Sequence, residues 1–386
     1  MNTRVAMLVI NAFTHDTRVE KEAKTLTNAG YTVTVFALHG GDLPETEERD
    51  GYLVERIHLR SRGWGTYFPV RLLKYLEFVV RAVSRVTRLR PAVVHAHDVN
   101  ALVPGYVAAR LSCAHLVYDA HELWADRHAA LLRAAWIRRL VVLVEKLLAR
   151  RADAVITVNP PIAELLAERY RIAPPVVLMN CQEYRPVERN DVLREELHIP
   201  PEQRIVIYPG ILAPGRGLEY LIRAVPYLDR AVVVLMGKDR LNGRLQSLVA
   251  QMGLEERVLF RDPVPPDEVP RYVASADLGV LPTQDMDLSY HYGAGNKLFH
   301  YLMAGIPAAV SDQPEKRRIV ETYGVGAVFD QTDPQDIARV INRLLNDEET
   351  YREMSRRARE AARDMLNWEV ESRRLLALYE RLVSVQ

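Results

Sequence analysis

The sequence predicts an α/β protein with two doubly wound domains and a C-terminal helical tail. Short β-branched runs alternate with longer amphipathic segments, a pattern typical of parallel sheets covered by helices. The 386 residues exceed what one ordinary hydrophobic core accommodates, so two domains are expected. A polar, proline-bearing stretch separates two such sets of strands and helices. We therefore expect a first domain at 1–180, a linker at 181–203, a second domain at 204–365 and a helix at 366–386 that packs back on the first domain.

Strands are expected where β-branched or apolar runs are bounded by polar or turn residues. In the first domain these runs are RVAMLVI, TVTVFAL, LVERIHL, AVVHAH, HLVYDA, DAVITV and VVLMN. In the second domain they are RIVIYPG, AVVVLMG, RVLFRD, LGVLP, PAAVS and GAVFD. From Asp347 onward the chain is charged and has helical spacing. Because open parallel sheets bind ligands beyond the carboxyl ends of their strands, we expect the two domains to face each other across a binding cleft.

Composition indicates a folded protein of a reducing compartment. The chain is 48% hydrophobic and 26% charged, as folded domains are. Its two cysteines, Cys113 and Cys181, are too few for a disulfide framework or a zinc site. No apolar run approaches the roughly 20 residues of a membrane span. The N-terminal MNTRVAMLVINAF is expected to form a strand and not a signal peptide, so we expect a cytoplasmic protein.

The net charge of +1 conceals an asymmetry between the two halves. Residues 1–180 carry 24 Lys and Arg against 18 Asp and Glu. Much of the excess lies in two amphipathic segments, at 71–90 and 133–151. These are interpreted either as helices with solvated basic faces or as a surface that contacts anionic lipid headgroups. No basic patch is interleaved with stacking aromatic residues, so no nucleic-acid partner is expected.

Glycine-rich loops follow several strands of the second domain. YPGILAPGRGLEYLIRA connects a strand to a helix, and Arg216 in this loop has the charge to grip a diphosphate. LMGKDRL places a glycine directly after the next strand. In GAGNKLFHYLMAGIP, at 293–307, small residues precede a helix N-terminus, where open N–H groups and the helix dipole favour an anion. Loops of this kind after successive strands predict an anion-binding edge.

Taken in order, the motifs resemble a known family over about residues 4–380. The second half carries PG…GRG…LI.A, MGK, V.F.D.VP…EVP.Y.A.ADLGVLP and NKLF.YLMAGIPAAVSD.PE…IV. The first half carries AFTHDTRVEKEAKTLTNAGYTVTVFAL, RPAVVHAHDVNALVPGYVAARL, LVYDAHELW and RRADAVITVNPPIAELLAERY. These stretches resemble the retaining GT-B glycosyltransferases of family four. The resemblance implies two Rossmann-like domains, the first for the acceptor and the second for a nucleotide-sugar donor.

The resemblance also implies roles for individual residues. Arg216 and Lys297 would pair with the donor diphosphate as charge develops on it during departure. His121 in YDAHELW matches the active-site histidine near the donor sugar and the acceptor. These three are the expected catalytic residues. The further donor-binding residues are expected to be Gly210, Gly215, Gly217, Gly237, Val264, Gly295, Asn296, Leu298 and His300.

Acceptor contacts are expected from the loop after the first strand. FTHDTR stands at the carboxyl end of that strand, so its polar side chains are placed to meet an acceptor. We expect Asn11, His15 and Arg18 to bind the acceptor, together with Glu122 beside the predicted active-site histidine.

The chain departs from the family pattern at three positions. The family usually carries two carboxylates eight residues apart on the approach to the helix in NKLF.YLMAG, whereas this chain has Tyr292 and His300. The second carboxylate normally accepts hydrogen bonds from the nucleotide ribose, and a neutral histidine accepts only one such bond. Ile211 stands where an arginine usually follows the first glycine. Either the ribose contact is made differently here, or donor binding is weakened.

Two stretches raise the question of a metal ion, and we expect none at either. Asp285 and Asp287 have the Asp-x-Asp spacing of a different glycosyltransferase fold, GT-A, but two aspartates in a polar loop are more often solvated. HAHD, at 95–98, has metal-capable side chains. Because successive strand residues point to opposite faces, we expect this stretch to be a strand-end loop that lines the cleft.

The sequence thus predicts a hexosyltransferase that moves a sugar from a nucleotide-diphosphate donor to the hydroxyl of a glycan, a lipid-linked acceptor or a small molecule. Retention, no metal or other cofactor, and a role in cell-envelope polysaccharide synthesis at the inner face of the membrane are expected. Two alternatives remain. One is a nucleotide-sugar 2-epimerase, whose elimination chemistry needs carboxylates not found here. The other is a non-catalytic partner subunit, suggested by the two lost carboxylates.

Overall fold

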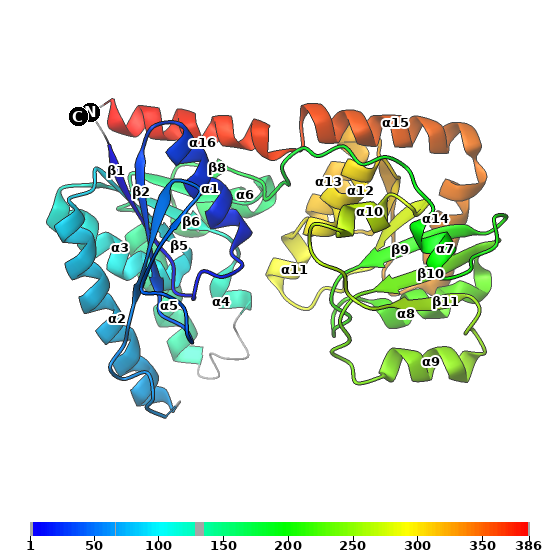
Figure 1. The fold of residues 1–386 in the computed structure, drawn as a ribbon, viewed down its shortest axis with the longest axis horizontal. Helices are drawn as coiled ribbons and strands as arrows, with labels where there is room; N and C mark the ends of the chain where they lie inside the picture. The colour runs from blue at the N-terminus through cyan, green and yellow to red at the C-terminus, as the bar shows by residue number, and fades with distance from the viewer. Residues whose placement is uncertain (1–2, 66, 128–134, 385–386) are drawn as a thin grey trace. The chain divides into compact units, whose positions relative to one another are not determined.

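The computed structural model describes residues 3–65, 67–127 and 135–384. The chain divides into two compact units, which we call unit 1 and unit 2 (Figure 1). Unit 1 comprises Met1–Asn180 and Glu371–Gln386, and unit 2 comprises Cys181–Val370. The chain therefore returns to unit 1 with its last helix. Both units have parallel sheets covered by helices, as the alternation of strand and helix patterns predicted.

The sheet of unit 1 has the strand order β3-β4-β2-β1-β5-β6-β7-β8. Its strand pairs are parallel except for the β3–β4 hairpin. The hairpin strand TEER was not expected, because it lacks apolar alternation and its place at the sheet edge requires none. VVLMN forms a strand of only two residues. The bounds are β1 Arg4–Leu8, β2 Thr32–Leu38, β3 Thr46–Arg49, β4 Tyr52–Ile57, β5 Val93–His97, β6 His115–Ala120, β7 Ala154–Thr157 and β8 Val176–Val177.

Helices cover this sheet in two groups. The first and the last helix share one buried core with β1, β2 and β5, to which the last helix contributes Leu375, Leu378 and Tyr379. Glu371 of the same helix accepts a hydrogen bond from the backbone N–H of Met179 at 3.0 Å. α3 packs on β5 and β6 and contacts both α2 and α5. The helices are α1 Thr17–Asn28, α2 Phe68–Leu89, α3 Asp98–Ser112, α4 Trp124–Arg127, α5 Ala135–Ala149, α6 Pro160–Tyr170 and α16 Trp368–Val383.

The sheet of unit 2 is parallel, with the order β11-β10-β9-β12-β13-β14. Its strands are β9 Arg204–Pro209, β10 Ala231–Met236, β11 Val258–Arg261, β12 Leu278–Leu281, β13 Ala308–Ser311 and β14 Gly326–Phe329. Its helices are α7 Val192–Glu196, α8 Leu218–Ala224, the 3-10 turn η1 Val225–Tyr227, α9 Arg244–Met252, α10 Val269–Val273, α11 Leu288–Tyr292, α12 Asn296–Ala304, α13 Pro314–Tyr323, α14 Pro334–Asn346 and α15 Glu348–Asp364.

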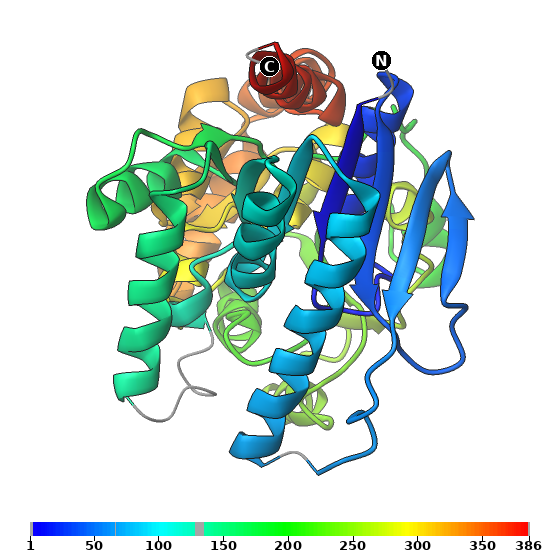
Figure 2. The ribbon, with the colours of Figure 1, turned by 90° about the vertical axis from the view of Figure 1, so that its left-hand side faces the viewer.

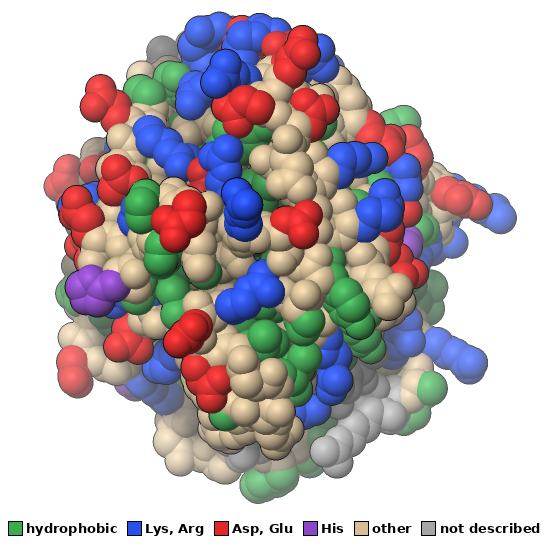
Figure 3. Space-filling model, turned by 90° about the vertical axis from the view of Figure 1, so that its right-hand side faces the viewer, with side chains coloured by type: hydrophobic (Ala, Val, Ile, Leu, Met, Phe, Trp, Pro, Cys, Tyr) green, Lys and Arg blue, Asp and Glu red, His purple; other side chains and the backbone are tan. Residues whose placement is uncertain are grey.

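The stretch 181–203, expected as a linker, is packed against unit 2. Val192 and Leu193 on α7 are buried, and Arg189 forms an ion pair with the buried Asp277 at 2.7 Å. The surface of unit 2 is rich in exposed charges, and the face seen in Figure 3 carries basic and acidic side chains intermixed. Among the described residues, no helix combines the length and apolar character that crossing a membrane requires.

The strand order fixes where each sheet can bind a ligand. In unit 1 the order reverses at β1, which lies between β2 and β5, and in unit 2 it reverses at β9, between β10 and β12. The loops that leave neighbouring strands at such a point diverge and open a crevice at the carboxyl edge. The loops singled out in the sequence follow these strands, so each unit has its own candidate site.

Replacing Leu375 with Ala tests whether α16 belongs to the core of unit 1. Leu375 is fully buried among residues of α1 and the sheet, so its truncation should lower the free energy of unfolding by about 2–5 kcal/mol. The matched control is Arg373→Ala on the exposed side of the same helix, which should change it by less than about 0.5 kcal/mol. Urea unfolding measures both. Equally small effects would show that α16 contributes little to this core.

Candidate functional site

Unit 2 brings its glycine loops together at the carboxyl ends of β9 and β10. Gly210 and Gly237 have φ angles of 135° and 154°, which residues with a side chain rarely adopt. A Cβ at Gly237 would lie 2.0 Å from the carbonyl oxygen of Gly210, and a Cβ at Gly210 would lie 2.4 Å from Cε of Lys297. The two loops and the lysine therefore meet where only glycine fits. Gly215 and Gly217 follow in the loop before α8.

The two cations predicted from the sequence lie over aromatic rings. Nζ of Lys297 is 4.9 Å from the ring centroid of Tyr208, and the guanidinium carbon of Arg216 is 5.3 Å from that of Tyr290. The buried Nε of Arg216 has no hydrogen-bond partner. Within the described chain neither cation forms an ion pair with a carboxylate. A buried donor without a partner, beside an unneutralised ammonium, makes this a place where an anion would be stabilised.

A third cation, Lys316 on α13, was not expected from the sequence. Its side chain is 1% exposed, and its Nζ donates hydrogen bonds to the carbonyl oxygen of Gly293, at 2.9 Å, and to Oε1 of Gln313. Nε2 of Gln313 donates in turn to the carbonyl oxygen of Thr283 at 3.3 Å. Lys316 therefore fixes the start of the loop that leads into α12.

Burial lowers the pKa of both lysines in this site. Burial, and then the charge of Arg216, lowers the pKa of Lys297 to about 8. Burial also lowers the pKa of Lys316 to about 7; the nearby Asp285 opposes this shift, and Arg216 and Lys297 add to it. An anion bound among the three cations would reverse both shifts, because it stabilises the charged forms.

α12 begins with an open N-terminus, as the sequence predicted. Gly295, with a φ of 78°, precedes the helix, and both it and Asn296 are exposed. Leu298 was expected to contact the donor, and this stays a prediction. Its side chain is fully buried, and its N–H donates to the carbonyl oxygen of Gly295 at 3.0 Å. Leu298 therefore anchors the first turn of α12 in the core.

The positions of the two missing carboxylates carry no negative charge. Burial, and then the nearby Lys297, lowers the pKa of His300 to about 4, so its ring is neutral at neutral pH and has one nitrogen that can accept a hydrogen bond. Tyr292 is the last residue of α11, directly before the glycine loop.

A pocket of about 310 Å³ lies at the carboxyl ends of β9, β10 and β11. The predicted Gly237 lines it, and Val264 follows the lining residue Pro263 in the chain. The other lining residues are Leu212, Leu235, Lys238, Asp239, Gln246, Phe260, Arg261 and Asp262.

Asp285 and Asp287 are engaged by neighbouring groups of the protein. Oδ1 of Asp285 accepts a hydrogen bond from Nε2 of Gln313 and lies 3.2 Å from Nδ1 of His291. Asp287 caps α11, since its Oδ1 accepts from the N–H of Tyr290 at 3.0 Å. Both aspartates thus have structural partners in unit 2.

In unit 1 a pocket of about 400 Å³ opens at the carboxyl end of β1. The predicted Asn11, His15, Arg18 and His121 line it, whereas Glu122 is not among its lining residues. Nδ2 of Asn11 donates to Oδ2 of Asp16 at 2.8 Å, which ties the two ends of the loop together. The complete lining is Asn11, Ala12, Phe13, Thr14, His15, Asp16, Thr17, Arg18, His121, Val158 and Asn180.

His121 directly follows β6, and each of its ring nitrogens lies near a carboxylate. Nε2 is 3.1 Å from Oδ2 of Asp119 and 3.2 Å from Nδ1 of His97. Nδ1 is 3.6 Å from Oδ2 of Asp98. Burial by itself would lower the pKa of His121, but Asp98 and Asp119 outweigh it and raise this pKa to about 10. His121 is therefore a cation at neutral pH.

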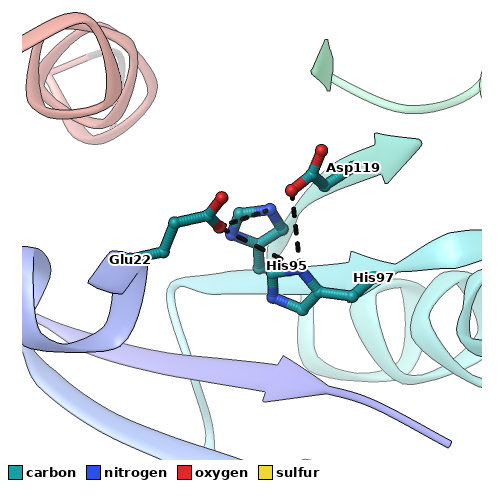
Figure 4. A group of neighbouring side chains, drawn as sticks. All are labelled: Glu22, His95, His97 and Asp119. Atoms are coloured by element: carbon teal, nitrogen blue, oxygen red, sulfur yellow. Dashed lines mark ion pairs between the residues drawn. The ribbon is translucent and has the colours of Figure 1, made fainter. Parts of the chain in front are cut away.

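Four buried side chains from three elements gather next to His121 (Figure 4). Glu22 comes from α1, His95 and His97 from β5, and Asp119 from β6. The two imidazole rings stack with their centroids 4.2 Å apart. Oε2 of Glu22 lies 3.8 Å from Nε2 of His95 and 4.0 Å from Nδ1 of His97. None of the four is more than 2% exposed, so each needs its charge or polarity satisfied inside unit 1.

Arg18 supplies a positive charge to this cluster. Its Nε and Nη2 donate to the two oxygens of Asp119 at 2.9 and 3.0 Å, and Nε lies 3.1 Å from Oε1 of Glu22. Nη1 donates to the carbonyl oxygen of Leu178 at 2.8 Å. Arg18 was expected to bind the acceptor. These bonds engage three of its five N–H donors, and the expectation stays a prediction.

The cluster of Glu22, His95, His97 and Asp119 has the residue types of a metal site. One ligand atom from each lies within 4.8 Å of the others. Arg18, however, already contacts both carboxylates, and a divalent ion between them would sit against its guanidinium at close range. We therefore interpret the cluster as a charge network in which Arg18 is the cation.

The expectation that 95–98 forms a strand-end loop is wrong for its two histidines. Residues two apart on a strand share one face, and both rings are buried in β5. Nδ1 of His95 lies 2.9 Å from the hydroxyl of Tyr379 on α16. The sequence did hold a signal, because the i, i+2 histidines and the i, i+4 pair of Arg18 and Glu22 each mark one face. That these faces meet is a property of the tertiary structure.

Two family models match the chain. Residues 189–361 match the model described as glycosyl transferases group 1, and residues 16–181 match the model described as glycosyltransferase family 4. A D-inositol 3-phosphate glycosyltransferase of Streptosporangium roseum is 24% identical over 357 residues, which cover 85% of this chain and 79% of that protein.

Solved structures of similar fold cover the whole chain. Sucrose-phosphate synthase from Thermosynechococcus elongatus matches with a TM-score of 0.79 at 20% identity over 100% of both chains. HepE of Anabaena, solved in complex with UDP, matches with a TM-score of 0.78 at 17% identity over 98% of this chain and 100% of that one. These likenesses show the GT-B fold, with its two α/β units and helical C-terminal tail. Since the two family models between them span both units, the protein belongs to the group 1 glycosyl transferases of family 4, and it is an enzyme of the hexosyltransferase type.

Proposed function

We propose that unit 2 binds a nucleoside diphosphate sugar and that the sugar passes to a hydroxyl group of an acceptor held by unit 1. The observation that carries this proposal is the convergence of Arg216, Lys297 and Lys316 beside glycine loops and an open helix N-terminus. A diphosphate is the part of such a donor that needs several positive charges. The HepE structures in complex with UDP and with UDP-glucose support this donor class.

In this reaction the bond between the anomeric carbon and the diphosphate oxygen breaks, and the electron pair leaves with the diphosphate. Arg216, Lys297 and the N-terminus of α12 stabilise the charge that develops there. The acceptor oxygen forms the new bond on the face that the diphosphate leaves, and its proton passes to the departing phosphate, so the configuration is retained. The product anomer, read by NMR, tests retention.

The rest of the donor fits the neighbouring groups of unit 2. The pocket of about 310 Å³ beside Gly237 accepts the planar base, with the backbone near Val264 at its edge. The neutral His300 accepts one hydrogen bond from the ribose, in place of the two that a carboxylate would accept. Calorimetric titration of the His300→Ala variant with UDP measures this contact.

On the acceptor side we assign the polar pocket of unit 1. Asn11 and His15 on its rim offer hydrogen-bonding groups for a hydroxyl-bearing acceptor. His121 contributes an N–H donor, since its ring is protonated at neutral pH. These three residues are the ones we expect to govern the Michaelis constant for the acceptor.

Among the possible classes of acceptor, the surface of unit 1 favours a lipid-linked acceptor at an anionic membrane. α2 exposes Leu72, Leu73, Leu76 and Val80, and α5 exposes Trp136, Leu140, Leu143 and Leu147. Basic side chains stand between them in both helices. Figure 2 views unit 1 from the side on which these helices lie, α2 in light blue and α5 in green. Apolar side chains interleaved with cations are suited to a headgroup interface.

Removing one cation of the donor site should weaken nucleotide binding. Arg216→Ala and Lys297→Ala each delete a charge-assisted contact of about 1.5–3 kcal/mol, so the dissociation constant for UDP should rise at least about tenfold. Arg343→Ala, an exposed cation on α14, is the control and should leave it unchanged. Calorimetric titration with EDTA present measures all three. Unchanged affinity in both site variants would overturn the diphosphate assignment, and a requirement for added Mg²⁺ would overturn metal independence.

Donor binding should take up protons above neutral pH. The pKa values of Lys297 and Lys316 are lowered to about 8 and about 7, and a bound diphosphate favours their charged forms. Below about pH 6 both lysines are protonated with or without the donor, so affinity for UDP-glucose should be constant there. As the pH rises through 7 and 8 the affinity should fall by about tenfold per pH unit for each proton taken up. Calorimetry in buffers of different ionisation enthalpy counts these protons. A pH-independent affinity from 6 to 9 would contradict the model of coupled lysines.

Binding to vesicles tests the membrane surface of unit 1. The protein should bind anionic vesicles at low salt and release them as salt rises, because exposed charges are screened beyond about 8 Å at physiological ionic strength. Trp136→Ala on α5 should weaken binding, whereas Tyr227→Ala, exposed to a similar extent on unit 2, should not. Co-sedimentation measures the bound fraction. Equal binding to neutral and anionic vesicles would point to a soluble acceptor.

A further inference from the structure

The chemistry of His121 depends on which of its nitrogens carry hydrogen. In a neutral imidazole one nitrogen donates a hydrogen bond and the other accepts. Nε2 lies 3.1 Å from Oδ2 of Asp119, so a neutral ring would place its single hydrogen there and leave Nδ1 as an acceptor. A protonated ring carries hydrogen on both nitrogens and makes Nδ1 a donor. Nδ1 lies 3.6 Å from Asp98, beyond hydrogen-bond range, so a ligand can still engage it.

Charged and titratable groups surround His121 from four elements. Asp119 precedes it on β6, Asp98 begins α3, His97 ends β5, and Arg18 and Glu22 come from α1. Burial, and then the neighbouring Asp119, raise the pKa of Glu22 to about 8, so two carboxylates, Asp98 and Asp119, oppose one guanidinium at neutral pH. A protonated His121 therefore supplies a second positive charge to a network that has too few of them.

Asp119 is the carboxylate whose position is fixed most firmly. It is fully buried, and both of its oxygens accept from Arg18, at 2.9 and 3.0 Å. Arg18 is itself held by the carbonyl oxygen of Leu178 and by Glu22. Asp119 cannot turn away from His121 without giving up two charge-assisted hydrogen bonds.

We propose that Asp119 is a positioning residue, which with Arg18 behind it fixes the ring of His121 and keeps it protonated so that Nδ1 donates to the reacting groups. This rests on the role proposed above for His121. The network thus turns a histidine that would otherwise titrate near neutral pH into a constant hydrogen-bond donor.

Imidazole NMR of the full-length protein tests the proposal without any substrate. With histidine labelled in the ring and His121 assigned from the His121→Asn variant, the wild-type ring should stay protonated from pH 6 to 9. In Asp119→Asn, which keeps an oxygen for Arg18 but loses the charge, the ring should titrate within that window. Glu22→Gln is the matched control, because it also replaces a buried carboxyl group beside Arg18, one that makes no hydrogen bond with the His121 ring. It should leave the ring protonated.

Three results would overturn the proposal. They are a neutral His121 in the wild type between pH 6 and 9, no difference between wild type and Asp119→Asn, and equal titration in the Asp119 and Glu22 variants. The first result concerns the wild type alone, so it can be measured even if Asp119→Asn fails to fold. A merely structural role for Asp119 would lower the melting temperature in both variants and move neither titration.

Turnover separates this inference from the proposed function. With UDP-glucose as the donor probe, Asp119→Asn should lose kcat progressively above pH 7 while its KM for the donor, bound by unit 2, stays unchanged. If His121→Ala leaves kcat unchanged, the role of His121 in the reaction fails. If His121→Ala abolishes turnover but Asp119→Asn keeps the wild-type pH profile, only the positioning role fails.

Discussion

A buried charge must have an opposite charge close to it, and the two units meet this constraint in opposite ways. In unit 1 the guanidinium of Arg18 lies against Asp119 and Glu22, so the charges are compensated within the protein. In unit 2 Arg216 and Lys297 lie over aromatic rings without a carboxylate partner in the described chain. We propose that compensation there comes from outside the chain, from the anionic diphosphate of the donor.

This contrast gives the two sites different responses to their surroundings. Unit 1 holds a prearranged network whose geometry is set by hydrogen bonds from α1, β5, β6 and, through Tyr379, α16. The loops of unit 2 are instead held in shape by contacts with neutral groups, such as Lys316 on the carbonyl oxygen of Gly293, while burial lowers the pKa of Lys297 and Lys316. Binding of an anion to unit 2 is therefore coupled to protonation, whereas the charge of His121 is fixed before any ligand arrives.

The absence of the two usual carboxylates also deprives the cations of unit 2 of a counter-charge from these two positions. Tyr292 and a neutral His300 add no negative charge near Lys297, so the attraction for a diphosphate is not reduced by an internal anion. In the proposed complex the ribose is held less firmly, because His300 offers it one acceptor nitrogen where a carboxylate would offer two oxygens. We infer that this chain holds its donor more by the diphosphate and less by the sugar of the nucleotide.

Local pattern was sufficient for the strands other than β3, the glycine loops and the open N-terminus of α12, because each depends on residues close together in the chain. The charges of the loops also marked Arg216 and Lys297, whereas His121 was predicted from the resemblance to the glycosyltransferase family. Local pattern did not show that the side chain of Leu298 is buried, since a helical residue next to a binding loop can turn either outward or into the core. Nor could it identify Lys316, one of three successive cations in KRR, or bring Arg18 and Glu22 onto His95, His97 and Asp119. Those pairings join residues up to 101 positions apart, and the desolvation that moves their pKa values exists only once the helix lies on the sheet.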